Sequence, residues 1–307
     1  MNDYFYKELC NTGCVKVAVV STYYGSDMGG AEVSSRLLVE GLRTAGHTVE
    51  VFGLTNSLTW LPLSVKAFLL NTHYLDRYVE NWLFKSLNGK DFDVVHIQDL
   101  MISVGAVRAC NRLSLKSVVT VRDVRFVCNL SVCQEDSQLC HGCTDSKYLE
   151  CLKIESKRRY DVSALAHLLK PFIQNRSVDL CGALLTASTV VAISKFISGE
   201  LLELGIESTV VYNPMPEWKL EKRIKNEDLV LFAPGRLESY KGHQYLISAI
   251  PKVLASGKRV QLRIAGTGGY EGELKKLVKT LKLESCVSFL GKLNYDEMHE
   301  EYRKSDP

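Results

Sequence analysis

The chain has 307 residues, of which 24% are charged and 46% hydrophobic, a composition typical of a folded globular protein and not of a disordered one. Its length exceeds that of one typical domain, so two domains are expected. The formal net charge of +3 is too small to indicate a nucleic-acid partner, and an anionic ligand would need a local cluster of cations.

The compartment follows from the N-terminus and the cysteines. The opening residues "MNDYFYKELC" contain no apolar core of the length that a signal peptide needs. The most apolar window, residues 180–193, is too short and too rich in Ser and Thr to cross a bilayer. Ten cysteines in such a chain favour reduced thiols or a bound metal over disulfides. We therefore expect a cytoplasmic protein.

Short β-branched runs alternate with amphipathic segments of helical length, which is typical of doubly wound parallel α/β sheets. A helix is predicted over residues 31–45, with an apolar face made by Val33, Leu37, Leu38 and Leu42. The strands predicted in the first part of the chain are residues 15–20, 48–52, 93–97, 117–121, 190–193 and 209–212.

A change of composition divides the chain. The stretch "YNPMPEWKLEKRIKNED" has two prolines and dense charge, which suits a linker. We predict an N-terminal domain over residues 1–214 with a Cys-rich insert at 124–152, a linker at 215–228 and a second domain at 229–307. The second domain has a predicted strand that begins at residue 229 and further predicted strands at 260–265 and 287–290. Since only these three precede "YRKSDP", we expect that domain to be truncated.

The most informative loop is "GRLESYKG", which follows the apolar run 229–234. Arg236 and Lys241 leave the strand end together and flank the start of a helix, where backbone N–H groups attract anions. That helix is predicted to have one apolar face, made by Tyr245, Leu246, Ala249, Ile250, Val253 and Leu254. The alternative is that both cations lie on the surface and pair with Glu238.

Two glycine-rich turns accompany these cations. Gly29 and Gly30 precede the first helix in "STYYGSDMGGAEVSSRLL", and "RIAGTGG" ends a strand at residues 263–269. Glycines let a backbone approach a ligand closely, although a tight turn would also explain the first pair. A nicotinamide enzyme would need G-x-G-x-x-G in the first turn, so Glu50 is weak evidence for one. A diphosphate bound between the carboxyl ends of two sheets explains both turns and both cations.

These residues carry a resemblance. The segments "GGAE", "GRLESYKG", "IAGTG", "VSFLG" and "VAISKFISGELLELGIESTVVYNP" are similar to those of family 4 glycosyltransferases, which have the GT-B fold of two Rossmann-like domains facing across a cleft. The resemblance implies a retaining enzyme that needs no metal for transfer. It would bind a nucleotide-diphosphate sugar mainly in the second domain and a saccharide or lipid-linked acceptor in the first. Polysaccharide or glycolipid assembly is the implied role.

The resemblance also assigns residues. Arg236 and Lys241 would bind the donor diphosphate and stabilise the charge on the leaving nucleotide. The segment 289–293 would lie near the base. The donor-binding positions implied are Gly29, Gly30, Glu32, Gly235, Gly266, Gly268 and Leu290.

Two departures from the family pattern affect the expected activity. Where members often carry His-Asp, this chain has Arg122 and Asp123 in "VRDVRF". Arg122 cannot act as a base but could contact sugar or phosphate, and a structural Arg122–Asp123 pair is the alternative. In the family, an E-x7-E pair of carboxylates that orients the donor sugar follows the segment that corresponds to "YRKSDP", so we expect this pair to be missing from residues 1–307. A catalytically silent nucleotide-sugar-binding or accessory protein is therefore the alternative function.

The insert has the pattern of a metal site. Cys140 and Cys143 form a C-x2-C pair, and Cys128 and Cys151 would complete a tetrahedral zinc site. Cys133 or His141 could replace one of them. The alternative is a set of reduced cysteines without metal.

Two segments mix aromatic and basic residues, at 60–87 and 153–176. Either could lie peripherally on an anionic membrane, as expected if the acceptor is lipid-linked. The alternative is a pair of ordinary packed helices.

Overall fold

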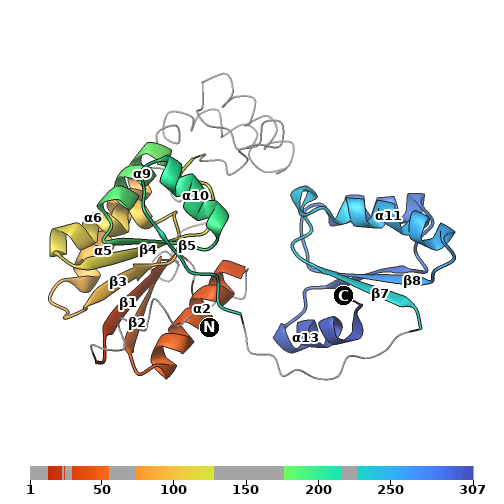
Figure 1. Cartoon of the computed structure of the whole chain (residues 1–307), viewed down its shortest axis with the longest axis horizontal. Coiled ribbons are helices and arrows are strands. Elements are labelled where there is room, and N and C mark those ends of the chain that lie inside the picture. The colour runs from red at the N-terminus through yellow and green to blue at the C-terminus, as the bar shows by residue number, and fades with distance from the viewer. Residues whose placement is uncertain are drawn as a thin grey trace, which may run out of the picture. The chain divides into compact units, whose positions relative to one another are not determined.

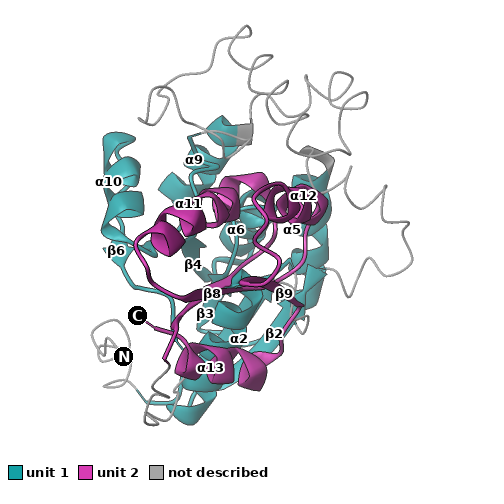
Figure 2. Ribbon diagram, turned by 90° about the vertical axis from the view of Figure 1, so that its right-hand side faces the viewer, with its two compact units in different colours: residues 1–153, 164–216 teal, residues 154–163, 217–307 magenta. Residues whose placement is uncertain are grey.

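The computed structural model describes residues 13–22, 24, 30–54, 73–127, 176–215 and 227–306. The chain forms two compact units, coloured separately in Figure 2. The first comprises Met1–Lys153 and Ala164–Pro216, and the second comprises Ile154–Ser163 and Glu217–Pro307. Each unit contains one parallel sheet.

The sheet of the first unit has six parallel strands in the order β2-β1-β3-β4-β5-β6. Each described strand lies within two residues of its predicted position, although β6 is shorter than expected. The strands are β1 (Lys16–Ser21), β2 (Thr48–Gly53), β3 (Val94–Ile97), β4 (Lys116–Val121), β5 (Thr189–Ala192) and β6 (Thr209–Val210).

Helices cover both faces of this sheet. Figure 1 shows α2 (Gly30–Thr44) on one face, and on the other α5 (His73–Leu87), α6 (Ser103–Leu113), α9 (Arg176–Thr186) and α10 (Lys195–Glu203). Alternate side chains of β1 pack on the two sides: Ala18 and Val20 belong to the larger core, while Val17 and Val19 pack with α2 residues. A parallel sheet buried on both faces needs such continuous apolar strands.

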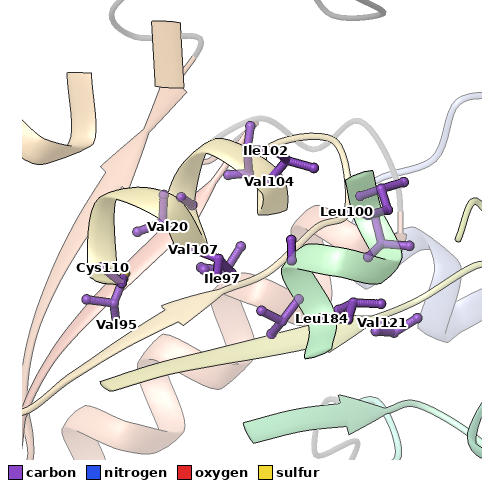
Figure 3. Packing of buried hydrophobic residues seen from close by; sticks show 14 of the residues in the cluster. Val20, Val95, Ile97, Leu100, Ile102, Val104, Val107, Cys110, Val121 and Leu184 are labelled. Atoms are coloured by element: carbon purple, nitrogen blue, oxygen red, sulfur yellow. The ribbon is translucent and has the colours of Figure 1, made fainter. Parts of the chain in front are cut away.

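The larger core is dense where α5 and α6 meet. Figure 3 shows Val107 and Cys110 of α6 beside Ile97 and Val95 of β3. A Cβ atom at Gly105 would lie 2.2 Å from the backbone oxygen of Asp76. Only glycine therefore allows the two helices to approach this closely.

The apolar face predicted for α2 is wrong in part. Leu42 is buried as expected, but Val33, Leu37 and Leu38 are only half-buried. The other buried residues of the helix are Ser34, Ser35 and Val39. The two serines are buried because polar groups at the carboxyl ends of β3 and β4 supply their hydrogen bonds.

The aromatic segment at 60–87 is described from residue 73 onward. There α5 buries Leu75, Val79, Leu83 and Leu87, and Trp82 and Phe84 pack against the same core. In this part the packed-helix interpretation accounts for the apolar residues. Residues 60–72 and 153–175 lie outside the described residues. None of the helices in the described ranges is long and apolar enough to cross a bilayer.

The second unit has a three-stranded parallel sheet of β7 (Leu229–Pro234), β8 (Val260–Ala265) and β9 (Val287–Gly291), with β8 central. A short 3-10 helix, η1 (Ser239–Lys241), follows β7. Figure 1 shows α11 (His243–Ala255) on one face of the sheet and α13 (Tyr295–Lys304) on the other, and in Figure 2 α12 (Glu271–Thr280) lies beside α11.

The predicted apolar face of α11 is also wrong in part. The helix buries His243, Ile247 and Ile250, with Leu246 and Val253 packed beside them. Tyr245 is 75% exposed, and Ala249 and Leu254 are exposed too. A helix on a three-stranded sheet with one neighbour buries a narrow stripe, so apolar residues at its edges remain in solvent.

A polar contact fixes α13 to the sheet. Arg263 of β8 forms a bidentate ion pair with Glu301, with N–O distances of 2.7 and 3.0 Å. Tyr302 packs edge-on against Phe232, with ring centroids 5.0 Å apart. After the helix, the Asp306 carboxylate accepts a hydrogen bond from the Val230 N–H at 2.7 Å. Residues 302–306 therefore belong to the folded unit.

Candidate functional site

The loop after β7 places two cations beside a helix start. The N–H of Lys241 donates to the Glu238 carbonyl at 2.9 Å, and the Gln244 side-chain amide donates to the Ser239 carbonyl at 2.8 Å. Gly242 then takes a left-handed conformation, with φ of 83°, and is the N-cap of α11. Without a Cβ it reaches this conformation at little cost, so the loop turns directly into the helix.

A second loop supports the first. The Leu237 N–H donates to the Thr267 carbonyl at 3.0 Å, and the Tyr270 N–H donates to the Leu237 carbonyl at 2.9 Å. A Cβ at Gly266 would lie 1.9 Å from the Gly235 oxygen, and one at Gly268 would lie 2.4 Å from the Leu237 oxygen. The contact between the two loops therefore itself requires both glycines. Their expected role in admitting a donor remains a prediction.

The cations of Arg236 and Lys241 both lie near the ring of Tyr240. Both residues are exposed, and the Arg236 guanidinium and the Lys241 ammonium lie 5.9 and 5.7 Å from the centroid of the Tyr240 ring. Within the described ranges, neither cation forms an ion pair with a carboxylate. The Glu238 carboxylate instead accepts from the Gly269 N–H at 3.4 Å, so the expected alternative, a pair with Glu238, does not form.

His243, which sequence reasoning did not single out, is buried at the first position of α11. Burial lowers the pKa of its imidazole and outweighs the opposite effect of a hydrogen bond with the Ala233 backbone, while the charge of Lys241 lowers the pKa further. The ring is therefore neutral at physiological pH and adds no charge to the loop. Its spacing from Ile247 and Ile250 is the signal that could have identified it as a core residue.

The segment predicted near the base lies on β9 and just after it. Leu290 is half-buried. The Lys275 ammonium lies 5.6 Å from the centroid of the Phe289 ring and pairs with Glu271 at 2.7 Å. The cation of Lys275 is thus partly neutralised by its own helix.

In the first unit, Arg122 forms a different kind of contact. Its guanidinium donates to the Gln98 carbonyl at 3.0 Å, to the Gln98 side-chain oxygen at 2.6 Å, to the Ser34 hydroxyl at 2.9 Å and to the side-chain oxygen of Asn213. These bonds use four of its five N–H groups. Arg122 therefore ties together the ends of β3 and β4, helix α2 and the segment that follows β6.

Charge around Arg122 is balanced at longer range. Burial lowers the pKa of its guanidinium, while the carboxylates of Asp99 and Glu32 act in the opposite direction. Asp99 itself accepts hydrogen bonds from the Thr22 N–H and hydroxyl, both at 2.8 Å. Arg122 remains charged because an arginine in a protein does not lose its proton.

Asp123 pairs with Arg125, with a 3.3 Å distance between the Arg125 Nε and the Asp123 carboxylate. Its other oxygen accepts from the Arg125 N–H at 3.1 Å. Among the described residues no Arg122–Asp123 ion pair forms, so that structural alternative is not what holds Arg122.

A cavity of about 40 Å³ lies beside Arg122, lined in part by His96, Thr120 and Asn213. The His96 Nε2 is 2.9 Å from the Thr120 hydroxyl. Burial, with a contribution from the charge of Arg122, lowers the pKa of His96 to about 3. The imidazole is neutral at any physiological pH and cannot act there as a charged donor.

The remaining predicted residues of the first unit divide between described and undescribed parts. Gly30 is the first residue of α2, and Glu32 lies in its first turn, whereas Gly29 lies outside the described residues. Glu50 pairs with Lys90 at 2.6 Å and so has a partner within the fold.

The predicted zinc ligands cannot be located. Cys128, Cys140, Cys143 and Cys151, with Cys133 and His141, lie outside the described residues. In the parts of the chain that are described, no three His, Cys, Asp or Glu side chains gather as a metal site would require. The described cysteines, Cys14, Cys110, Cys181 and Cys286, are free thiols.

Known proteins match both units. Residues 28–217 match Glycosyltransferase Family 4, and residues 214–306 match Glycosyl transferases group 1. An uncharacterized glycosyltransferase of Methanocaldococcus jannaschii is 24% identical over 95% of this chain and 73% of its own length.

Solved structures agree on the fold. The catalytic domain of starch synthase IV from Arabidopsis thaliana, bound to ADP and acarbose, is 14% identical with a TM-score of 0.59, over 96% of this chain and 77% of that one. Anabaena HepE in complex with UDP is 16% identical with a TM-score of 0.50, over 91% and 70%. The predicted α/β GT-B class is confirmed. The match to Glycosyltransferase Family 4 spans more than half of the residues of this chain, and the chain therefore belongs to that family.

Proposed function

We propose that this glycosyltransferase takes its sugar from a nucleotide-diphosphate sugar, whose diphosphate binds Arg236 and Lys241. The observation that carries the proposal is that these two cations are exposed and not neutralised. Both are exposed on a loop braced by backbone hydrogen bonds, and within the described residues neither is neutralised by a carboxylate.

The start of α11 adds to this charge. Gly242 caps the helix without a side-chain hydrogen bond. The Tyr245 N–H donates to the Gly242 carbonyl at 3.0 Å, which leaves the N–H groups of the first two helical residues for a ligand. A helix N-terminus carries partial positive charge and attracts anions. A guanidinium fork, an ammonium and free N–H groups on one loop suit a diphosphate.

The chemistry of transfer suits the same groups. When the bond between the anomeric carbon and the diphosphate oxygen breaks, negative charge grows on the leaving nucleoside diphosphate. Fixed cations stabilise that charge in the transition state more than in the ground state. Following the resemblance, we propose transfer with retention of anomeric configuration, with Gly235, Gly266, Gly268 and Leu290 near the donor.

The first unit is proposed to bind the acceptor, a saccharide or lipid-linked sugar in polysaccharide or glycoconjugate assembly. Following the resemblance, we propose Gly30 and Glu32 as donor-binding residues of this unit and Asp123 as a catalytic residue. We propose that the enzyme acts in the cytoplasm, with peripheral membrane contact if the acceptor is lipid-linked.

A thermal-shift panel tests the donor proposal. UDP, GDP and ADP are each added to the chain, to Arg236→Ala and to Arg259→Ala. Arg259 is a matched control because it stands just before β8, at the opposite edge of the parallel sheet from the carboxyl end of β7, and pairs there with Glu227 and Asp228. At about 100 times the dissociation constant, a bound nucleotide stabilises a protein by about 2.7 kcal/mol.

We expect at least one nucleotide to raise the melting temperature of the wild type and of Arg259→Ala, and to raise that of Arg236→Ala distinctly less. If none of the three raises it in any variant, the donor proposal fails. A chain that binds a nucleotide yet releases no nucleoside diphosphate from its sugar conjugates would instead be a silent binding protein.

A further inference from the structure

We infer that Tyr240 is a positioning residue, whose ring holds Arg236 and Lys241 ready for the diphosphate without neutralising them. The inference rests on the proposed function of those two cations. The inference gives Tyr240 a role that is separate from the role of the glycines, which shape the loop, and from that of the two cations, which carry its charge.

Both cations contact the same ring, that of Tyr240. The Arg236 guanidinium lies 5.9 Å and the Lys241 ammonium 5.7 Å from the centroid of the Tyr240 ring. A cation within about 6 Å of an aromatic centroid is attracted by the ring's quadrupole. One ring at the middle of η1 therefore attracts both cations, which stand on either side of it in sequence.

The Tyr240 ring restricts the two cations without neutralising them. Long cationic side chains lose rotamer freedom when a ligand fixes them, and this loss weakens binding. A carboxylate could fix them in advance, but it would cancel the charge that attracts the ligand. An aromatic ring has no net charge, so it restricts the cations and leaves their full charge for a phosphate.

The neighbouring ion pairs show this contrast. Lys275 lies near the Phe289 ring but also pairs with Glu271 at 2.7 Å, and Arg263 is fully engaged by Glu301. These cations are tied to acids of their own unit. Within the described residues Arg236 and Lys241 are held by an aromatic ring alone.

The Tyr240 ring contributes little to the packing of its unit. Tyr240 is 48% exposed and does not belong to the hydrophobic core of its unit. Its removal should therefore leave the stability of the fold nearly unchanged. Tyr245 offers a matched control, because it stands on the same loop–helix junction, is 75% exposed and contacts neither cation in the described structure.

The test is calorimetric titration of UDP, GDP and ADP into the whole chain and into four variants. Tyr240→Leu removes the ring, Tyr240→Phe keeps it, Tyr240→Glu replaces it by a carboxylate, and Tyr245→Leu is the control. Melting temperatures are recorded for each variant, so that a change in affinity can be separated from a change in folding.

For the nucleotide that binds the wild type, we expect Tyr240→Leu to weaken binding about fivefold, as two exposed cation–ring contacts imply. Tyr240→Phe and Tyr245→Leu should match the wild type. Tyr240→Glu should bind more weakly than Tyr240→Leu, because it neutralises the site.

Equal affinity in Tyr240→Leu and the wild type would overturn the inference while leaving the proposed function intact. A Phe variant as weak as the Leu variant would also overturn it, since the hydroxyl and not the ring would then matter. If the wild type binds none of the three nucleotides, the proposed function fails first, and the role of Tyr240 falls with it.

Discussion

Two arginines at the ends of strands show how the same side chain serves two purposes. Arg122, after β4, spends four N–H groups on oxygens of Gln98, Ser34 and Asn213. Arg236, after β7, is exposed and contacts the Tyr240 ring. The first has four of its five N–H groups engaged by its own protein, whereas among the described residues the guanidinium of the second is not engaged by a carboxylate. The comparison teaches that partners, and not position at a strand end, decide whether a cation is available to a ligand.

The largest effect is expected where the loop that carries Arg236 is held in place. Gly266→Ala should destabilise the second unit by about 4 kcal/mol, because the new Cβ would collide with the Gly235 oxygen 1.9 Å away and φ is 130°. Gly269→Ala is the control, since nothing lies within 4 Å of its Cβ position. Scanning calorimetry measures both. Equal melting of the two variants would show that the loops do not brace each other.

A smaller loss is expected in the first unit. Arg122→Met should lower the free energy of unfolding by about 3 kcal/mol, because it removes the partner of several acceptors that are partly buried. Arg108→Met is matched to it, since Arg108 has only a half-exposed contact with Asp179 at 3.7 Å; its loss should stay below about 1 kcal/mol. Urea unfolding compares them. If the two variants lose the same free energy of unfolding, the hydrogen bonds of Arg122 do not stabilise the first unit as described.

The smallest effect is a pH dependence of the polar cluster around Arg122. Because the pKa of His96 is lowered from 6.5 to about 3 in the folded chain, the unfolded chain binds a proton below pH 6.5 that the folded chain does not. Stability is therefore lost as pH falls from about 6.5 toward 3, by about 2 kcal/mol at pH 5.

A His96→Gln variant should lack this loss. The measurement is the difference in unfolding free energy between pH 7 and pH 5, which cancels any constant effect of the substitution on packing. An equal difference in the wild type and the variant would contradict the lowered pKa of His96.

Much of the fold could be predicted from the sequence because buried parallel strands have a strong signal. Strand β8, in which Val260, Leu262 and Ile264 alternate with polar residues, was predicted with its observed bounds, residues 260–265. Helix faces were less predictable. Ser34 and Ser35 are buried only because Gln98 and Arg122, distant in sequence, meet them, and no local pattern contains that pairing.

The site shows the same division. The cations of "GRLESYKG" could be predicted, because strand, glycine and helix start are local features. The partners of Arg122 could not, since Asn213 is 91 residues away in sequence. The glycines of "IAGTGG" were predicted for the approach of a donor, yet two of them are already required by the contact of one backbone with another.

Calorimetric titration of the double variant Arg236→Ala/Lys241→Ala tests the central claim most directly. UDP, GDP and ADP are each titrated into the wild type, the double variant and the Arg259→Ala control. Loss of two charge-assisted contacts should weaken binding of the preferred nucleotide about 100-fold or more, with the melting temperature unchanged and Arg259→Ala binding as the wild type does. Unchanged affinity in the double variant would contradict the account.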